Sequence, residues 1–118
     1  MNLEISEDQI QQSVIEWCNW HPPLDELVIH IANQRKCSKA YGGHLRKMGL
    51  KRGVPDLFVA LQNHGFAGCF IEIKSAKGKL SPYQGEFLLR MKQQGYYVAC
   101  CNNIDDTIKL LRWYAGIG

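Results

Sequence analysis

The first apolar pattern along the chain has the spacing of a helix. An apolar residue recurs every three or four positions, at Ile10, Val14, Trp17 and Cys18. Ser6 followed by Gln9 forms the residue pair of a capping box, which begins a helix. Pro22 has no amide hydrogen to donate, so it ends the pattern. We therefore predict a helix from Glu7 to about Trp20.

Four shorter apolar runs have the composition of strands. They are rich in β-branched and aromatic residues and cover residues 27–32, 57–61, 68–73 and 96–101. The second and third runs are separated by six residues that contain Gly65, which suits the left-handed position of a hairpin turn. We expect these two strands to pair as an antiparallel hairpin.

The register of this hairpin decides which polar side chains face each other. We expect Leu61 to pair with Ala67 across the connection. In that register Asp56 falls directly opposite Glu72. Residues opposite each other in an antiparallel pair have Cβ atoms about 4.5–5.5 Å apart and point to the same face. The two carboxylates should then share one face of the sheet, unless a one-residue bulge loosens the pairing.

Two further helices are predicted in the second half of the chain. Ser81, Pro82 and Gln84 combine an N-cap, a first-turn proline and a second capping box, and the helix should end at Gly95. Asn103 begins the last helix. The helix between the third and fourth strands makes their parallel pairing the expected arrangement.

The resulting order of elements is α-β-β-β-α-β-α. It predicts an α/β fold in which a central mixed sheet of four strands is flanked by helices on both faces. The 118 residues are enough for one core and too few for a second, so we expect residues 1–118 to form a single domain.

The segment between the first two strands is long and basic. We expect residues 33–53 to form a loop with one helical turn near residues 44–48, and loops this long are usually functional. Residues 27–55 contain no acidic residue, although the net charge of the whole chain is only +3. A basic patch of this kind binds phosphates without sequence preference, although a solvated basic loop is the alternative on charge alone. Its members are Arg35, Lys36, Lys39, Arg46, Lys47, Lys51 and Arg52.

Composition excludes several classes of protein. With 46% hydrophobic and 21% charged residues, the chain has the profile of a folded globular protein. No stretch approaches the roughly 18 apolar residues of a membrane helix, and the first residues lack the regions of a signal peptide, so we expect an intracellular protein. The five cysteines include no CxxC pair, which favours buried free thiols over disulfides or a zinc site.

The polar residues of the hairpin indicate the chemistry. Glu72 and Lys74 lie two apart on a strand and therefore project to the same side. Charges in an otherwise apolar run need a partner, and a metal ion held by Asp56, Glu72 and the carbonyl of Ile73 would supply one. Lys74 could then orient the attacking water or offset charge on the phosphate. The alternative is an ordinary Glu72–Lys74 ion pair, with Asp56 capping a turn.

The motif GVPD followed by IEIK resembles the signature of the PD-(D/E)xK nucleases. More narrowly, KRGVPDLFV, FIEIKS and GKLSPYQGEFLLRMKQQGYYV resemble the VRR-NUC family of virus-type replication-repair nucleases, and the similarity spans nearly the whole chain. The resemblance implies a restriction-endonuclease-like core. It also implies that Asp56 and Glu72 are metal ligands and Lys74 is the motif lysine.

Two further assignments come from the same resemblance. Gln84 matches the glutamine after the serine-proline pair, although its place in a capping box would explain it equally. Glu7 matches the acidic residue of the first helix that completes the metal site, with Asp8 as the alternative ligand. Lys77 and Lys79 follow the motif lysine and are expected to contact phosphates.

The resemblance implies a Mg²⁺- or Mn²⁺-dependent endonuclease that acts on DNA. Larger members of the family carry additional DNA-binding domains, which we do not expect within these 118 residues. Stand-alone members resemble Holliday junction resolvases, in which a homodimer places two sites on opposed strands of branched DNA. The alternative is a catalytically inactive module that binds DNA through the same fold. A purely structural protein would leave both the basic loop and the paired acids unexplained.

Overall fold

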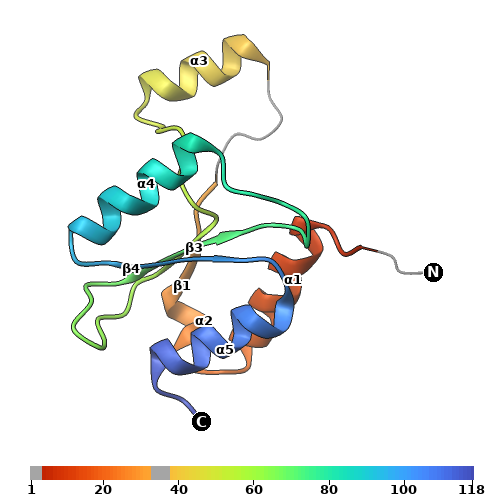
Figure 1. Ribbon diagram of the computed structural model, residues 1–118, viewed down its shortest axis with the longest axis vertical. Helices are drawn as coiled ribbons and strands as arrows, with labels where there is room; N and C mark the ends of the chain where they lie inside the picture. The colour runs from red at the N-terminus through yellow and green to blue at the C-terminus, as the bar shows by residue number, and fades with distance from the viewer. Residues whose placement is uncertain (1–3, 33–37) are drawn as a thin grey trace.

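A computed structural model of the protein describes residues 4–32 and 38–118 (Figure 1). Its elements, in chain order, are α1 (Glu7–Asn19), α2 (Leu24–Leu27), β1 (Val28–His30), α3 (Lys39–Lys47), β2 (Leu57–Val59), β3 (Cys69–Ile73), α4 (Pro82–Gln93), β4 (Tyr97–Cys101) and α5 (Ile104–Ala115). The predicted order is confirmed, with α2 and α3 added to it.

The capping residues begin the helices where the sequence predicts. In α1 the Ser6 side chain accepts a hydrogen bond from the Gln9 amide, and the Gln9 side chain accepts one from the Ser6 amide. Ser81 and Gln84 form the same reciprocal pair at the start of α4. These hydrogen bonds confirm both capping boxes. Each box stabilises its helix because it satisfies amide groups that the first helical turn leaves without partners.

Helix α3 is longer than the predicted turn at residues 44–48. It begins at Lys39, where the Ser38 side chain accepts a hydrogen bond from the Tyr41 amide. The adjacent Gly42 and Gly43 have low helix propensity, and they concealed this helix in the sequence. Figure 1 shows α3 at one end of the molecule, beyond α4 and away from the sheet.

The four strands form one mixed sheet in the order β1-β2-β3-β4. The β1–β2 and β2–β3 pairs are antiparallel and the β3–β4 pair is parallel, as predicted. Leu57 pairs with Ile71, and Val59 pairs with Cys69. This is the register expected from the sequence, because its continuation places Asp56 opposite Glu72. Gly65 has φ +81° in the hairpin turn, also as predicted.

Helices cover both faces of the sheet (Figure 1). One face carries the fully buried residues of β2 and β3, such as Leu57 and Ile71, which lie in a core with residues of α1 and α5. The opposite face carries Phe70, whose ring contacts that of Phe87 on α4. Glu72 follows Phe70 at a spacing of two and therefore lies on the α4 face.

The cysteines agree in part with the expectation of buried free thiols. Cys18, Cys69 and Cys101 are buried free thiols in the described part of the chain, whereas Cys100 is exposed. Within residues 4–32 and 38–118, no helix has both the length and the apolar character needed to cross a membrane. Cys37 and two of the predicted basic residues, Arg35 and Lys36, lie outside the described residues.

Candidate active site

Asp56 is held at the start of β2 by its own loop and by the neighbouring strand. It is 2% exposed, and its Oδ2 accepts a hydrogen bond of 2.8 Å from the Ile73 amide. Gly53, three residues earlier, has φ +78°. A Cβ atom at Gly53 would lie 2.4 Å from the carbonyl carbon and oxygen of Tyr83. Only glycine lets this loop lie directly against the first turn of α4.

Glu72 lies on a central strand of the sheet and is fully buried. Its Oε1 lies 3.8 Å from Lys74 Nζ and accepts a hydrogen bond of 3.4 Å from Gln84 Nε2. The Lys74 side chain is itself mostly buried. An ammonium and an amide donor are therefore directed at one oxygen of a carboxylate that the strand holds rigidly.

Gln84 serves two neighbours at once. Its Oε1 accepts a hydrogen bond of 2.8 Å from the Ser81 amide, which completes the capping box. Its Nε2 donates to Glu72. The two roles that the sequence left as alternatives are therefore compatible, because they use opposite ends of the same amide. The start of α4 and the acid on β3 are joined by this one side chain.

Cys100 belongs to the same group of residues, and it was not singled out from the sequence. It pairs with Glu72 across the parallel β3–β4 ladder. Burial raises the pKa of the Cys100 thiol, and the carboxylates of Glu72, Asp56 and Glu7 raise it further, while the Lys74 ammonium lowers it. The four charged residues predicted for the site thus all act on one thiol. Cys100 could be assigned to the site only from the register of the parallel β3–β4 pair, which the sequence does not give.

Glu7 approaches this group from the first turn of α1. It is half-buried, whereas Asp8 is exposed. Its carboxylate is near enough to Cys100 to raise the pKa of the thiol. The charged groups thus come from the sheet and from α1, while Gln84 comes from α4. Glu7 as a third metal ligand stays a prediction, as does the carbonyl of Ile73.

The donor set suits a hard divalent cation. Mg²⁺ is commonly bound by one or two carboxylates, with waters and substrate phosphate oxygens completing its coordination. Asp56 and Glu72, opposed on adjacent chain segments, provide two such carboxylates. Among the described residues, no three His, Cys, Asp or Glu side chains are grouped to hold a metal ion by themselves. Backbone carbonyl, water and phosphate oxygens would be suitable further ligands.

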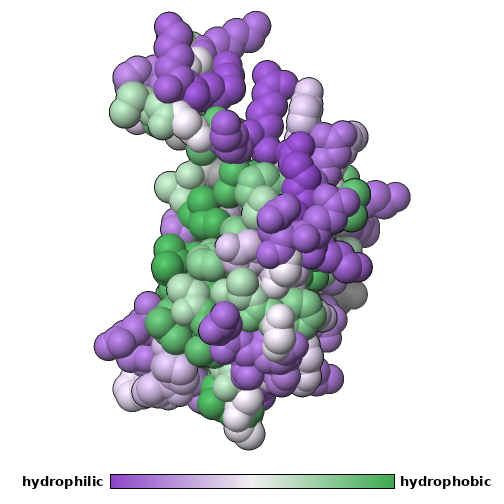
Figure 2. All heavy atoms as spheres, turned by 90° about the vertical axis from the view of Figure 1, so that its left-hand side faces the viewer, coloured by the Kyte–Doolittle hydropathy of each residue, from purple (hydrophilic) through white to green (hydrophobic). Residues whose placement is uncertain are grey.

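Four of the basic residues predicted to contact DNA lie at one end of the molecule. On α3 and in the loop after it, Lys39, Arg46, Lys47 and Lys51 are exposed. Figure 2 shows that the protruding end formed by α3 is hydrophilic, while apolar side chains gather over the middle of the same face. Basic side chains on this protrusion are free to approach a phosphate backbone.

Arg52 connects this basic segment to the site. It donates a hydrogen bond of 3.1 Å to the Tyr83 hydroxyl, and its guanidinium lies 5.1 Å from the centre of the Tyr83 ring. The other predicted phosphate contacts, Lys77 and Lys79, are exposed beyond β3. Lys77 Nζ lies 3.6 Å from Glu4 Oε1, a surface pair that adds little stability. DNA contact by any of these residues stays a prediction.

Comparison with known proteins gives the same result as the motifs. The chain is similar over 98% of its length, and over 93% of the other chain, to a solved structure described as a VRR_NUC domain protein. The TM-score is 0.84 and the sequence identity 24%, so this likeness concerns the fold. No match was found among curated proteins. The VRR-NUC domain matches residues 4–103, which include both acids, the lysine and the glutamine, and the chain therefore belongs to the VRR-NUC family.

Proposed function

We propose that this protein is a Mg²⁺- or Mn²⁺-dependent endonuclease that hydrolyses DNA phosphodiester bonds. One observation carries the proposal: two buried carboxylates, Asp56 and Glu72, oppose each other beside a mostly buried Lys74. Burying three charged groups in a small protein is costly unless they act together. The nuclease-type fold of the VRR-NUC family is the second support.

Each side chain of the site has a separate task in this mechanism. Asp56 and Glu72 would hold the divalent ion, which would supply polarisation of the phosphoryl oxygen and a lower pKa for a bound water molecule. The Ile73 amide fixes the orientation of Asp56, and Gln84 fixes that of Glu72. These contacts keep the carboxylates in place, so no reorganisation is needed when substrate arrives.

Lys74 contributes positive charge where negative charge develops. Its ammonium lies beside Glu72. In the transition state the nonbridging phosphate oxygens gain negative charge, which a nearby ammonium in a water-poor site stabilises strongly. The same ammonium can hold the attacking water by a hydrogen bond. Removing this charge should therefore slow cleavage more than it weakens DNA binding.

We also propose that the enzyme acts as a homodimer on branched DNA. A two-fold dimer presents two identical sites to strands of opposite direction. Large apolar side chains are exposed and available for an interface, including Trp20 at 80% and Leu89 at 56% exposure. The basic protrusion of α3 would then extend each site along a separate duplex arm.

Cleavage of a four-way junction, a flap and a plain duplex in Mg²⁺ or Mn²⁺ tests the proposal. We expect metal-dependent cleavage that Asp56→Asn and Lys74→Ala each reduce by about 10²-fold or more. Lys109→Ala, an exposed lysine of α5, is the matched control and should cleave as wild type does. Salt-sensitive binding without cleavage of any of these DNAs would instead show a DNA-binding module.

A further inference from the structure

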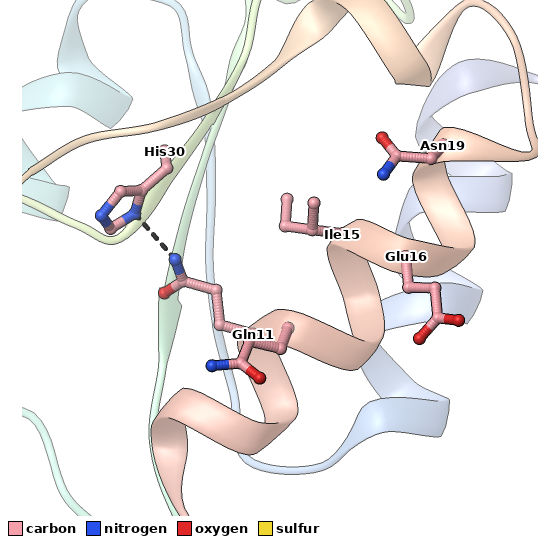
Figure 3. A pocket seen from close by; sticks show the side chains of 6 residues that line it. Gln11, Ile15, Glu16, Asn19 and His30 are labelled. Atoms are coloured by element: carbon pink, nitrogen blue, oxygen red, sulfur yellow. Dashed lines mark hydrogen bonds between the residues drawn. The ribbon is translucent and has the colours of Figure 1, made fainter.

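A cavity of about 380 Å³ lies between α1 and the edge strand β1. This volume is within the range of small-molecule sites in proteins. Its lining comes from one side of α1 and from β1, namely Gln11, Gln12, Ile15, Glu16, Asn19 and His30. Figure 3 shows Gln11 and His30 meeting at one end, Asn19 at the other, and Ile15 between them. The mechanism above uses none of these residues.

The two elements that line the cavity, α1 and β1, also contact residues of the candidate active site. Gln11 follows Glu7 by four residues, so the two side chains lie on the same side of α1, about 6 Å apart along its axis. On the other wall, the residue after His30 is Ile31, whose amide donates a hydrogen bond of 2.8 Å to the Asp56 carbonyl. Because His30 pairs with Leu57, it lies on the α1 face of the sheet, whereas Glu72 lies on the α4 face. A strand of DNA at the carboxylates would therefore reach the cavity around the end of β1.

The lining selects a neutral, flat group that forms hydrogen bonds. Glu16 is the one acidic residue of the lining, and its negative charge disfavours phosphate. Three carboxamides, those of Gln11, Gln12 and Asn19, offer both donors and acceptors. Ile15 offers an apolar surface for a ring. A nucleobase has this combination of an apolar face and a hydrogen-bonding edge.

The hydrogen bond between Gln11 and His30 fixes the polarity of one end. Gln11 Nε2 donates to His30 Nδ1 at 2.7 Å. The imidazole therefore carries its hydrogen on Nε2, as a donor, while the oxygen of Gln11 remains an acceptor. One donor and one acceptor thus remain at this end of the cavity, and the edge of a base carries groups of both kinds.

We propose that this cavity binds one unpaired nucleobase of the DNA strand that lies at the carboxylates. The proposal rests on the proposed function for its ligand, and it adds a reason for structure selectivity. A paired base cannot enter the cavity without leaving its duplex, which costs the free energy of its stacking and pairing. The unpaired arm of a flap offers bases that have already lost that pairing, so a flap binds with less penalty than a plain duplex.

The test uses oligonucleotides that carry a single 2-aminopurine at successive positions of the unpaired arm of a flap. The fluorescence of this base changes when it is removed from its stacked neighbours. Ca²⁺ replaces Mg²⁺ so that the strand stays intact, and a denaturing gel verifies this. For the full wild-type chain we expect a fluorescence change at one position only. Asn19→Trp, which fills the cavity from an exposed position, should abolish it.

The affinities of cavity variants for flap and duplex DNA distinguish binding in this cavity from general DNA binding. Asn19→Trp should weaken binding of the flap about tenfold, or about 1.4 kcal/mol, and that of plain duplex less than twofold. Gln11→Ala, which removes the hydrogen bond to His30, should act in the same direction. Gln62→Trp places the same ring on an exposed glutamine at the hairpin end of the sheet, and it should behave as wild type.

Several results would overturn the proposal. One is a fluorescence change that Asn19→Trp leaves intact, and another is an equal loss of flap and duplex binding. Cleavage in Mg²⁺ is measured on the same DNAs. Cleavage without a position-specific fluorescence change rejects the base site alone. A position-specific change without cleavage supports the base site and rejects the endonuclease.

Discussion

Replacing Gly53 by alanine tests whether the loop before Asp56 must lie against the first turn of α4. The new Cβ would lie 2.4 Å from the Tyr83 carbonyl and 2.7 Å from the Gln84 amide nitrogen. Real Cβ atoms do not approach other atoms so closely, so the loop or the helix must move by about 1 Å. Both segments carry site residues, Asp56 on one and Gln84 on the other.

The cost has two parts that can be separated. The positive φ of +78° at Gly53 is unfavourable for alanine by about 1 kcal/mol. The overlap with backbone atoms, which cannot rotate away as a side chain can, adds about 1–3 kcal/mol. A displacement of about 1 Å at a reacting centre typically costs on the order of 10²-fold in rate. We therefore expect Gly53→Ala to lose stability and, more strongly, cleavage activity.

Gly65→Ala is the matched control for this variant. Gly65 has φ +81°, almost the same as Gly53, but no atom lies within 4 Å of its would-be Cβ. It lies in the hairpin turn, at the opposite end of β2 from Asp56. Gly65→Ala should therefore lose only the stability that the positive φ costs alanine, and it should keep the cleavage rate of the wild type.

Thermal unfolding and the rate of Mn²⁺-dependent cleavage measure the two effects. The expected result is a melting temperature lower for Gly53→Ala than for Gly65→Ala, and a cleavage rate reduced only in Gly53→Ala. If the two variants unfold alike, or if Gly53→Ala cleaves within twofold of wild type, the contact does not position the site.

Three further predictions concern Gln84, the reactivity of Cys100 and the basic residue Lys47. Gln84→Glu keeps the capping-box acceptor but sets a carboxylate against Glu72, so cleavage should fall at least tenfold with little change in melting temperature. An alkylating reagent at pH 8 should label Cys100 but not Cys69, because Cys100 is exposed although its pKa is raised, whereas Cys69 is fully buried and burial raises its pKa to about 12; peptide mass spectrometry identifies the labelled residue. Lys47→Ala should weaken binding to all DNA sequences alike and lower the slope of log affinity against log salt by about one, as measured by fluorescence anisotropy.

Each of these predictions has its own control. Gln93→Glu adds the same charge at an exposed position of α4 and should leave cleavage unchanged. In urea, Cys69 should become labelled, and labelling of native Cys69 as fast as Cys100 would contradict the burial argument. Lys109→Ala removes an equal charge from α5, and an equal change in the salt slope would show that the basic protrusion has no special role.

The opposition of Asp56 and Glu72 could be derived from the sequence because it follows from a short hairpin. The alternation of β2 and β3 and the length of their connection fix the register, and the register brings Asp56 and Glu72 together. This depends only on neighbours in the chain. The capping box at Ser81 is equally local, so the start of α4 was predicted correctly as well.

Cys100 and Gly53 show what the sequence could not provide. Cys100 faces Glu72 only because β3 and β4 are parallel, and the register of a parallel pair depends on how the helix between them packs. Gly53 reads as an ordinary turn residue, although its contact is with a helix that starts 29 residues later. Tertiary packing decides both, and no local pattern encodes it.

The position of Glu72 on an interior strand has a consequence for the dynamics of the protein. The Ile73 amide donates a hydrogen bond to the Asp56 carboxylate, and the Lys74 amide donates one to the Cys101 carbonyl. Interior strands of a sheet commonly open only when the whole molecule unfolds. The Ile73 amide should therefore exchange its hydrogen with solvent among the slowest in the chain, and the two acids should keep their alignment as long as the protein stays folded.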